Sequence, residues 1–202
     1  MQAIYAEETR PARADPSVVE WGIGSASRRS SISATRPYIA RLDSDHEAQL
    51  SALLCGLEKS FRINRFGHPA SDARLQRYAK EAAARAAYMA GAFDADRLIG
   101  VVEVFAARDG IAEVAFAIDA NWRRRGHGSA LLEAATRWAG QAGVATLRMV
   151  ISRNNWPMRQ LAHKVGARLD LDLDEIFADV SVAPAAYPWQ VPLTPSGSQT
   201  LP

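Results

Sequence analysis

Apolar residues recur at changing intervals along the chain, and each interval predicts a different kind of element. In the first part of the folded region, a short alternating run is followed by two stretches with helical spacing, each preceded by a residue that can cap a helix. The pattern predicts a strand at 37–42, a helix from Asp43 or Ser44 to about Phe61, and a second helix from Ser71 to about Ala87.

The period then shortens to that of strands, and turn signals separate the apolar runs. Three strands in a row predict an antiparallel meander, after which strands and helices alternate. The predicted strands are 88–93, 98–106, 111–118, 145–152, 168–173 and 175–182, and the further helices follow Gly128 and Asn155. The predicted order is therefore β-α-α-β-β-β-α-β-α-β-β.

The two ends of the chain lack such patterns. Residues 1–35 mix Ser, Ala, Arg and Glu without a sustained period, which predicts a flexible N-terminal extension. Residues 184–202 are rich in proline, which disfavours helix and central strand. We therefore expect one folded domain at 36–183 within the 202 residues, with a proline-rich tail behind it.

Composition places the chain among globular proteins, with 48% hydrophobic and 23% charged residues. No apolar window reaches the length of a membrane-spanning helix, and the start of the chain lacks the features of a signal peptide. The single cysteine, Cys55, cannot form an internal disulfide, which suits a reducing compartment. These features predict a cytoplasmic protein with no membrane partner.

The charge is nearly balanced, with 24 basic and 22 acidic residues and a net charge of +2. Such a balance does not favour a nucleic-acid partner. Three arginines nevertheless stand side by side in the segment Arg123–Ser129, whose sequence is Arg-Arg-Arg-Gly-His-Gly-Ser. This local concentration of charge needs an explanation of its own.

The segment Arg123–Ser129 has the features of an anion site. Its glycines let the backbone approach a ligand, and the N–H groups and dipole of the following helix favour negative charge. The spacing matches neither the dinucleotide-binding fingerprint nor the Walker loop, so nucleotide hydrolysis and hydride transfer are not predicted. A pyrophosphate is the expected guest.

This segment resembles the Arg/Gln-x-x-Gly-x-Gly/Ala signature of the GNAT superfamily of N-acetyltransferases. A second stretch, Asn155–Ala167, resembles the family's Asn-x-x-Ala-x-x-Leu-Tyr-x-x-x-Gly-Phe motif and has the right spacing from the first. The stretch from Ala112 to Arg123 also resembles the catalytic domain of bacterial protein-lysine acetyltransferases. The resemblance covers about 36–182.

The resemblance implies the GNAT fold, an α/β fold of the α+β kind. Its mostly antiparallel mixed sheet would have about seven strands with four helices, splayed between strands four and five. It also implies transfer of an acetyl group from acetyl-CoA to a primary amine, either a protein lysine or a small molecule. The residues that it assigns to acetyl-CoA are Phe116, Ile118, Arg123, Arg124, Arg125, Gly126, His127, Gly128, Ser129 and Asn155. The Ile118 amide would stabilise the oxyanion.

The incoming ammonium must lose a proton before it attacks, so a carboxylate is the expected base. Glu113 is the first candidate because it matches the glutamate base of the lysine-acetyltransferase branch, and Glu103 on the neighbouring strand is the second. One position departs from the family: Ala162 stands where many relatives have the tyrosine that protonates the leaving thiolate. The acid is therefore unassigned.

The four histidines and Cys55 lack metal-ligand spacing, so no metal is predicted. Two segments compete for the acceptor. Arg62, Arg65 and His68 would make the loop at 63–70 basic unless they are paired. The last two strands are instead acidic and could receive a cationic amine, through Asp170, Asp172, Asp174, Glu175 and Asp179.

Two other functions stay open. The first is a catalytically silent acyl-CoA-binding regulatory module, which Ala162 favours and which predicts that Glu113 is dispensable. The second is an arginine-dependent nucleic-acid-binding protein, which predicts binding that falls steeply with salt. The sequence does not fix the acceptor, the acyl chain preference or the oligomeric state, a homodimer being one option.

Overall fold

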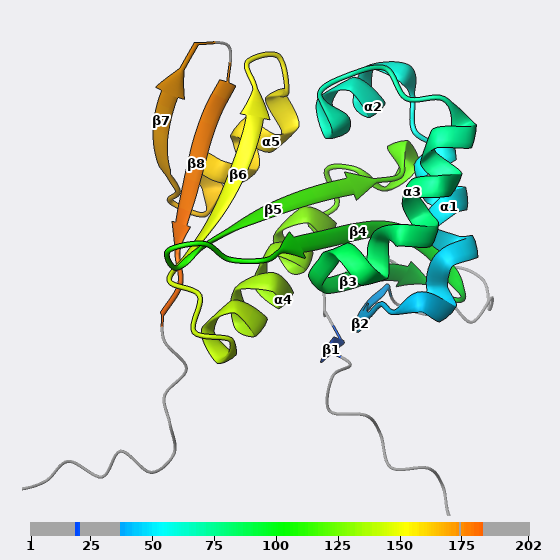
Figure 1. Ribbon diagram of the computed structural model, residues 1–202, viewed down its shortest axis with the longest axis horizontal. Helices are drawn as coiled ribbons and strands as arrows, with labels where there is room; N and C mark the ends of the chain where they lie inside the picture. Colours follow the sequence, from blue (N-terminus) through cyan, green and yellow to red (C-terminus); the bar gives the residue numbers. More distant parts are fainter. Residues whose placement is uncertain (1–18, 21–36, 174, 184–202) are drawn as a thin grey trace, which may run out of the picture.

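The computed structural model describes residues 19–20, 37–173 and 175–183 (Figure 1). The expected flexible extension and proline-rich tail lie outside these residues, apart from 19–20. Eight strands of the described residues form one mixed sheet in the order β1-β2-β3-β4-β5-β6-β8-β7. All neighbouring strands are antiparallel except β5 and β6, which are parallel. The GNAT fold that the sequence predicts is confirmed.

The strands follow the predicted apolar runs closely. Their bounds are β1 Val19–Glu20, β2 Tyr38–Arg41, β3 Ala86–Asp94, β4 Arg97–Phe105, β5 Ile111–Ile118, β6 Thr146–Ser152, β7 Arg168–Asp172 and β8 Glu175–Ser181. The two-residue strand β1 pairs with β2 at the sheet edge and was not predicted. The β4–β5 turn needs left-handed backbone at Asp109 and Gly110, which Asp and Gly adopt more readily than most residues.

The described residues contain five α-helices, one more than predicted. They are α1 Glu47–Cys55, α2 Lys59–Phe66, α3 Asp72–Arg85, α4 His127–Gln141 and α5 Trp156–Lys164. The single helix expected up to Phe61 is interrupted at Gly56, where α1 ends, and Leu57 is buried in the break. The chain resumes as α2, which includes the start of the loop expected at 63–70 and ends at the left-handed Gly67.

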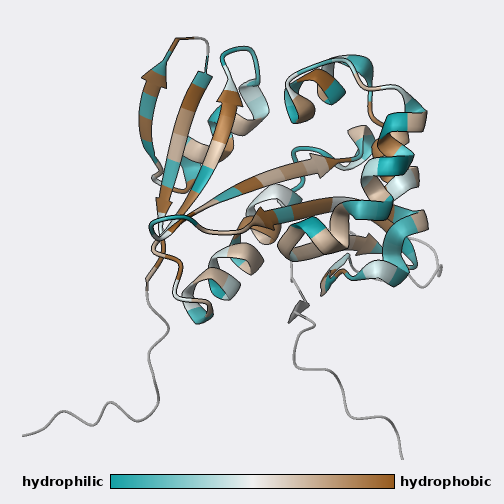
Figure 2. Ribbon diagram, viewed as in Figure 1, coloured by the Kyte–Doolittle hydropathy of each residue, from teal (hydrophilic) through white to brown (hydrophobic). Residues whose placement is uncertain are grey.

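Two hydrophobic cores lie on opposite faces of the sheet, because successive strand residues point to opposite sides. Helices α1 and α3 pack Leu50, Leu54 and Leu75 against one face. Helix α4 packs Leu131 and Ala135 against the other face, and α5 adds Ala162 to the same core. Figure 2 shows hydrophobic strands between helices whose outward sides are hydrophilic.

The sheet opens between β5 and β6, which are the fourth and fifth strands of the prediction. These strands pair only over Ile111–Glu113 and Thr146–Arg148 and then diverge (Figure 1). Beyond Glu113, β5 pairs with β4 alone. The predicted splay is present, and it leaves one edge of β5 open toward α5.

Candidate active site

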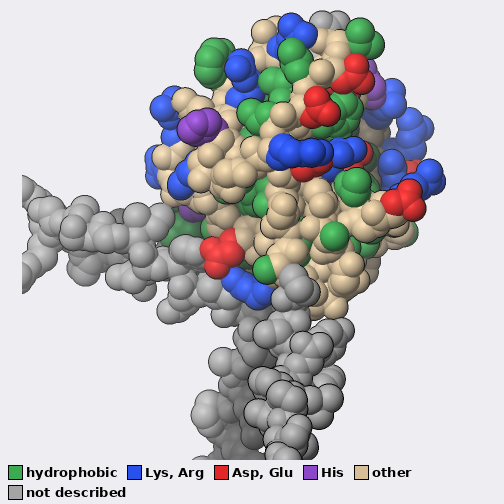
Figure 3. Space-filling view, turned by 90° about the vertical axis from the view of Figure 1, so that its left-hand side faces the viewer, with side chains coloured by type: hydrophobic (Ala, Val, Ile, Leu, Met, Phe, Trp, Pro, Cys, Tyr) green, Lys and Arg blue, Asp and Glu red, His purple; other side chains and the backbone are tan. Residues whose placement is uncertain are grey.

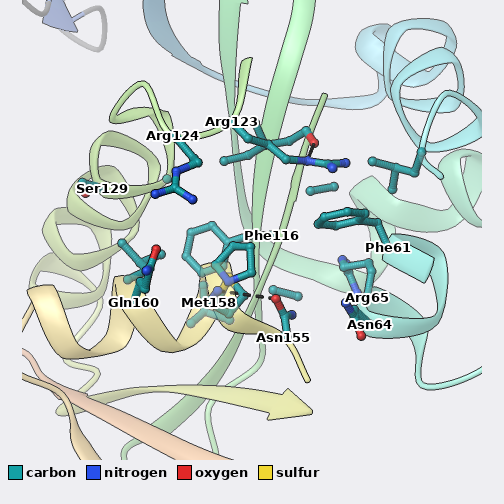
Figure 4. Close-up of a pocket in the computed structure, with 18 of the residues that line it drawn as sticks. Phe61, Asn64, Arg65, Phe116, Arg123, Arg124, Ser129, Asn155, Met158 and Gln160 are labelled. Carbon is teal, nitrogen blue, oxygen red and sulfur yellow. Dashed lines mark hydrogen bonds between the residues drawn. The ribbon is translucent and has the colours of Figure 1, made fainter. Parts of the chain in front are cut away.

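A cavity of about 310 Å³ occupies the opening between β5 and β6, and we call it the cleft. Its walls come from α2, the second half of β5, the segment Arg123–Ser129 and the face of α5 (Figure 4). The Ser152 hydroxyl donates a hydrogen bond of 3.1 Å to the Asn64 side-chain oxygen, and this bond joins the end of β6 to α2. The cleft is therefore bridged on that side rather than open along its whole length.

The open edge of β5 supplies backbone polar groups to the cleft. The Asp119 N–H donates to the Ile99 carbonyl at 2.9 Å. Because hydrogen-bonded pairs alternate along an antiparallel ladder, the N–H and C=O groups of Ala115 and Ala117 also point toward β4. The alternate residues Val114, Phe116 and Ile118 then direct their N–H and C=O groups to the side where β6 has diverged. All three line the cleft. This arrangement places the Ile118 amide where a carbonyl oxygen in the cleft could accept from it.

The segment Arg123–Ser129 brings the start of α4 to one end of the cleft. Arg124 and Gly126 both have positive φ, at 61° and 90°, and Gly126 caps α4 without a side-chain hydrogen bond. The first N–H groups of an α-helix have no partner within the helix. They lie beside Gly128 and Ser129, which line the cleft. A Cβ at Gly128 would be in ordinary van der Waals contact with Ile118 and Leu161, at 3.5 and 3.6 Å.

The three consecutive arginines have three different environments. The Arg124 side chain is exposed and lines the cleft near Ser129 (Figure 4). Arg123 also lines the cleft, but it donates to the Ile118 carbonyl at 3.0 Å and to Glu58 at 3.1 Å, over the ring of Phe61. Arg125 lies over the Trp122 ring and does not line the cleft. Arg124 is the cleft-lining member of the run whose side chain makes no hydrogen bond with a described residue, and the Arg123 Nη2 is also unpaired.

His127 and Asn155, which were both expected to contact acetyl-CoA, have different surroundings. His127 is buried, lies edge-on to the Trp122 ring and does not line the cleft; burial, followed by the nearby Arg125, lowers the pKa of its imidazole. Asn155 does line the cleft, and its side-chain oxygen accepts from the Met158 N–H at 3.4 Å, capping α5. Its side-chain nitrogen has no hydrogen bond to another described residue.

The two candidate bases differ sharply in their surroundings. Glu113 is exposed, lines the cleft and also lines a second cavity beside α3. Glu103 is fully buried and lines neither. One of its oxygens accepts from Arg65 and the other accepts from the Tyr78 hydroxyl at 2.9 Å. Both oxygens of Glu103 are thus engaged, whereas the carboxylate of Glu113 is accessible.

The triad of Arg65, Tyr78 and Glu103 is a buried charge network between α2, α3 and β4. Burial, partly offset by Arg65, raises the pKa of Tyr78 to about 12. Burial alone would lower the pKa of Arg65, but the negative charge of Glu103 raises it. The network therefore holds a charged arginine, a neutral tyrosine and a charge-paired carboxylate. Arg65 lines both cavities from this fixed position.

Helix α5 contributes residues that the motifs did not reveal. Gln160 and Lys164 line the cleft, and the Lys164 ammonium donates to the Ser129 hydroxyl at 3.2 Å. Positions 157, 160, 161 and 164 share one face at helical spacing, which could have revealed Lys164 once α5 was placed opposite α4. Ala162, in contrast, is fully buried in the core and does not line the cleft. Among the described residues that line the cleft there is no tyrosine.

Two other features are absent from the described residues. No cluster of three or more His, Cys, Asp and Glu side chains there could hold a metal ion. None of the helices found there is both long and apolar enough to cross a membrane.

Comparisons with known proteins agree with this fold. The model of the acetyltransferase (GNAT) family matches residues 53–167. No curated protein matches the chain. Among solved structures, the GNAT domain of S. lividans PAT is 17% identical and superposes with a TM-score of 0.64, over 73% of this chain and 91% of that one.

Two other solved structures are similar to a comparable degree. The PaiA N-acetyltransferase from Thermoplasma acidophilum, in complex with coenzyme A, is 16% identical with a TM-score of 0.58, over 73% of this chain and 99% of that one. The ribosomal-protein-S18-alanine N-acetyltransferase from Escherichia coli is 17% identical with a TM-score of 0.56, over 74% of this chain and 96% of that one. At this level of identity the likeness concerns the fold.

Proposed function

Because the chain belongs to the GNAT acetyltransferase family, we propose that it transfers an acetyl group from acetyl-CoA directly to a primary amine. The observation that carries the proposal is the open edge of β5. It runs from the uncapped start of α4 to Glu113, so one cleft joins an anion site, free backbone donors and an accessible carboxylate.

The residues at the α4 end of the cleft fit a pyrophosphate. The first N–H groups of α4 would donate to the phosphate oxygens, and the helix dipole favours their charge. Arg124 lies near Ser129, Lys164 donates to the Ser129 hydroxyl, and both would add charge-assisted hydrogen bonds. Asn155 and the groups of Phe116 and Ile118 would hold the pantetheine arm.

Acetyl-CoA supplies an activated acyl carbon as a thioester. The Ile118 N–H would donate to the carbonyl oxygen and stabilise the negative charge that develops on it. Glu113 would take a proton from the ammonium of the acceptor, directly or through one water. Overall a C–N bond forms and a C–S bond breaks, and the ammonium loses two protons, one to the thiolate and one to solvent.

A silent acyl-CoA-binding module is the second candidate, and one observation favours it. Ala162 lies in the core, and the cleft-lining residues include no tyrosine that could protonate the thiolate. A thiol with a pKa near 8.5 can leave without a dedicated acid, so the missing tyrosine does not by itself abolish transfer. We propose a cytoplasmic location for either activity, in keeping with the single, unpaired Cys55.

Glu113→Gln tests the transferase directly. We expect the rate of thiol release to an amine panel to fall about 10²–10⁴-fold, because general-base catalysis contributes that much. The affinity for acetyl-CoA, measured by calorimetric titration, should stay the same. The matched control is Glu133→Gln, since Glu133 is exposed on α4 and pairs with Arg137 away from the cleft.

The outcomes separate the candidates. Acetyl-CoA binding with Glu113-dependent thiol release supports acetyl transfer. Binding without turnover on any amine favours the silent module. If acetyl-CoA does not bind at all, both proposals are wrong.

A further inference from the structure

A second cavity of about 400 Å³ adjoins the cleft, and we call it the side cavity. It lies between α3, the end of α2 with the following loop, and the facing ends of β4 and β5. Arg65 and Glu113 line both cavities and so stand at their boundary. An acceptor whose amine lies at Glu113 would extend naturally into the side cavity.

Four arginines and His68 line the side cavity, against two acidic residues, Glu81 and Glu113. One face of α3 contributes Arg74, Arg77, Glu81 and Arg85 at helical spacing, and His68 lies across from it. The side chains of Arg74 and Arg77 make no ion pair or hydrogen bond with any described residue. Arg85 approaches Glu81 only at 3.9 Å, with both side chains more than half exposed. Because Glu103 already balances Arg65, the arginines of α3 leave the cavity with positive charge to spare.

The competing acidic surface lies elsewhere. Asp179 on β8 is held by Arg148 through two hydrogen bonds of 2.7 and 2.8 Å, and it lies 3.7 Å from Arg168. The hydrogen bond from Arg148 lowers the pKa of Asp179. Figure 3, which looks at the side of the molecule with β7 and β8, shows basic and acidic side chains interspersed there. None of the described acidic residues of β7 and β8 lines either cavity.

We propose that the amine acceptor carries an anionic group, a carboxylate or a phosphate, which the arginines of α3 bind in the side cavity. This inference rests on the proposed acetyl transfer and deepens it. The charges then match at both ends of the acceptor, with the ammonium at Glu113 and the anion at Arg74 and Arg77. A simple diamine would meet like charge along the same path, which is unfavourable.

The test compares acceptors that carry an anionic group with neutral-ended counterparts. A series of ω-amino acids of increasing length is assayed beside their primary amides, and O-phosphoethanolamine beside ethanolamine, by thiol release from acetyl-CoA. We expect the best anionic acceptor to exceed its neutral partner about 10–100-fold in kcat/KM, since hydrogen bonds between charged groups give discrimination of this size. The carboxylate and phosphate arms tell which anion is preferred.

Arg74→Gln should reduce this preference at least several-fold, mainly through the KM of the anionic acceptor. The matched control is Lys80→Gln, which removes the same charge from the same helix but faces a different surface hollow. Its preference should equal that of the wild type. A merely structural effect of Arg74→Gln would slow both members of a pair equally and leave the ratio unchanged.

Binding measurements keep the inference separate from the proposed function. Each pair is also titrated calorimetrically into protein saturated with coenzyme A, where no transfer occurs. Tighter binding of the anionic member that is lost in Arg74→Gln supports the subsite even if no amine is acetylated, in which case only the transferase proposal fails. Equal binding and equal turnover within every pair would overturn the subsite.

Discussion

Two walls of the cleft are built in different ways. The loop wall, which is the segment Arg123–Ser129 with the start of α4, offers backbone N–H groups set by left-handed residues at Arg124 and Gly126. The helical wall, which is α2 backed by α3, offers the side chain of Arg65, fixed by its buried network with Tyr78 and Glu103. A wall made of backbone tolerates many side chains, whereas a wall made of a charge network depends on each member.

The helical wall is therefore the easier one to break. Glu103→Gln removes the buried negative charge that faces Arg65, whose side chain is only 9% exposed. Breaking a buried ion pair by removing one partner costs about 3–5 kcal/mol, so we expect the free energy of unfolding in chemical denaturation to fall by that amount. The exposed Glu113→Gln should change it by less than about 0.5 kcal/mol.

A double variant checks the cause of that loss. Arg65→Leu with Glu103→Leu removes both charges, and replacing a buried pair by apolar residues is often close to neutral. It should recover more than half of the lost stability. If Glu103→Gln and Glu113→Gln destabilise the protein equally, the network does not hold the helical wall.

The loop wall could be predicted from the sequence because its chemistry is contiguous. Glycine spacing and basic residues within seven positions indicate an anion site before any fold is known. The same pattern does not say where each side chain points, and Arg123 and Arg125 turn to Ile118 and Trp122 instead of lining up at one anion. The backbone conformation at single residues decides the direction of each side chain, and the hydrophobic pattern of the sequence does not encode that conformation.

The helical wall could not be predicted in the same way, since its members are far apart in the chain. Residues 65, 78 and 103 meet only through packing of α2 and α3 on β4, and α2 itself was hidden by a break at Gly56. Glu103 was therefore a plausible base from the sequence, since a strand position alone does not show that both oxygens are engaged. The regular alternation of β5, by contrast, predicted its bounds and the positions of Phe116 and Ile118.

Substitutions of two neighbouring arginines test whether position or total charge determines anion binding at the loop wall. Arg124→Gln removes a side chain that lines the cleft, and we expect the Kd for acetyl-CoA to rise about 10–100-fold because a charge-assisted hydrogen bond is lost. Arg125→Gln makes the same change in charge one residue along, where the guanidinium lies over Trp122. Its Kd should rise less than about 3-fold, in the range of exposed charge effects.

Calorimetric titration of acetyl-CoA at two salt concentrations measures the Kd of both variants. The effect of Arg124→Gln should shrink at high salt, because an exposed charge is screened. Equal losses for the two variants would mean that bulk charge, rather than the position of Arg124, holds the anion.

The smallest effect concerns the hydroxyl at the centre of the helical wall. Burial raises the pKa of Tyr78 to about 12 in the folded protein from 10.0 when unperturbed, so the unfolded state ionises first as the pH rises. The stability that depends on this shift is complete below pH 10 and is lost as the pH approaches 12. At 1.36 kcal/mol for each pKa unit, the total loss is at most about 3 kcal/mol, of which about 1 kcal/mol falls below pH 11.

Tyr78→Phe cannot ionise, so its deficit in unfolding free energy relative to the wild type should shrink by about 1 kcal/mol between pH 9 and 11. Tyr88, whose pKa is also raised by burial, is common to both proteins and cancels in the difference. A deficit that stays constant over this range would show that the Tyr78 hydroxyl is open to solvent, and that the helical wall is looser than the contacts of Glu103 indicate.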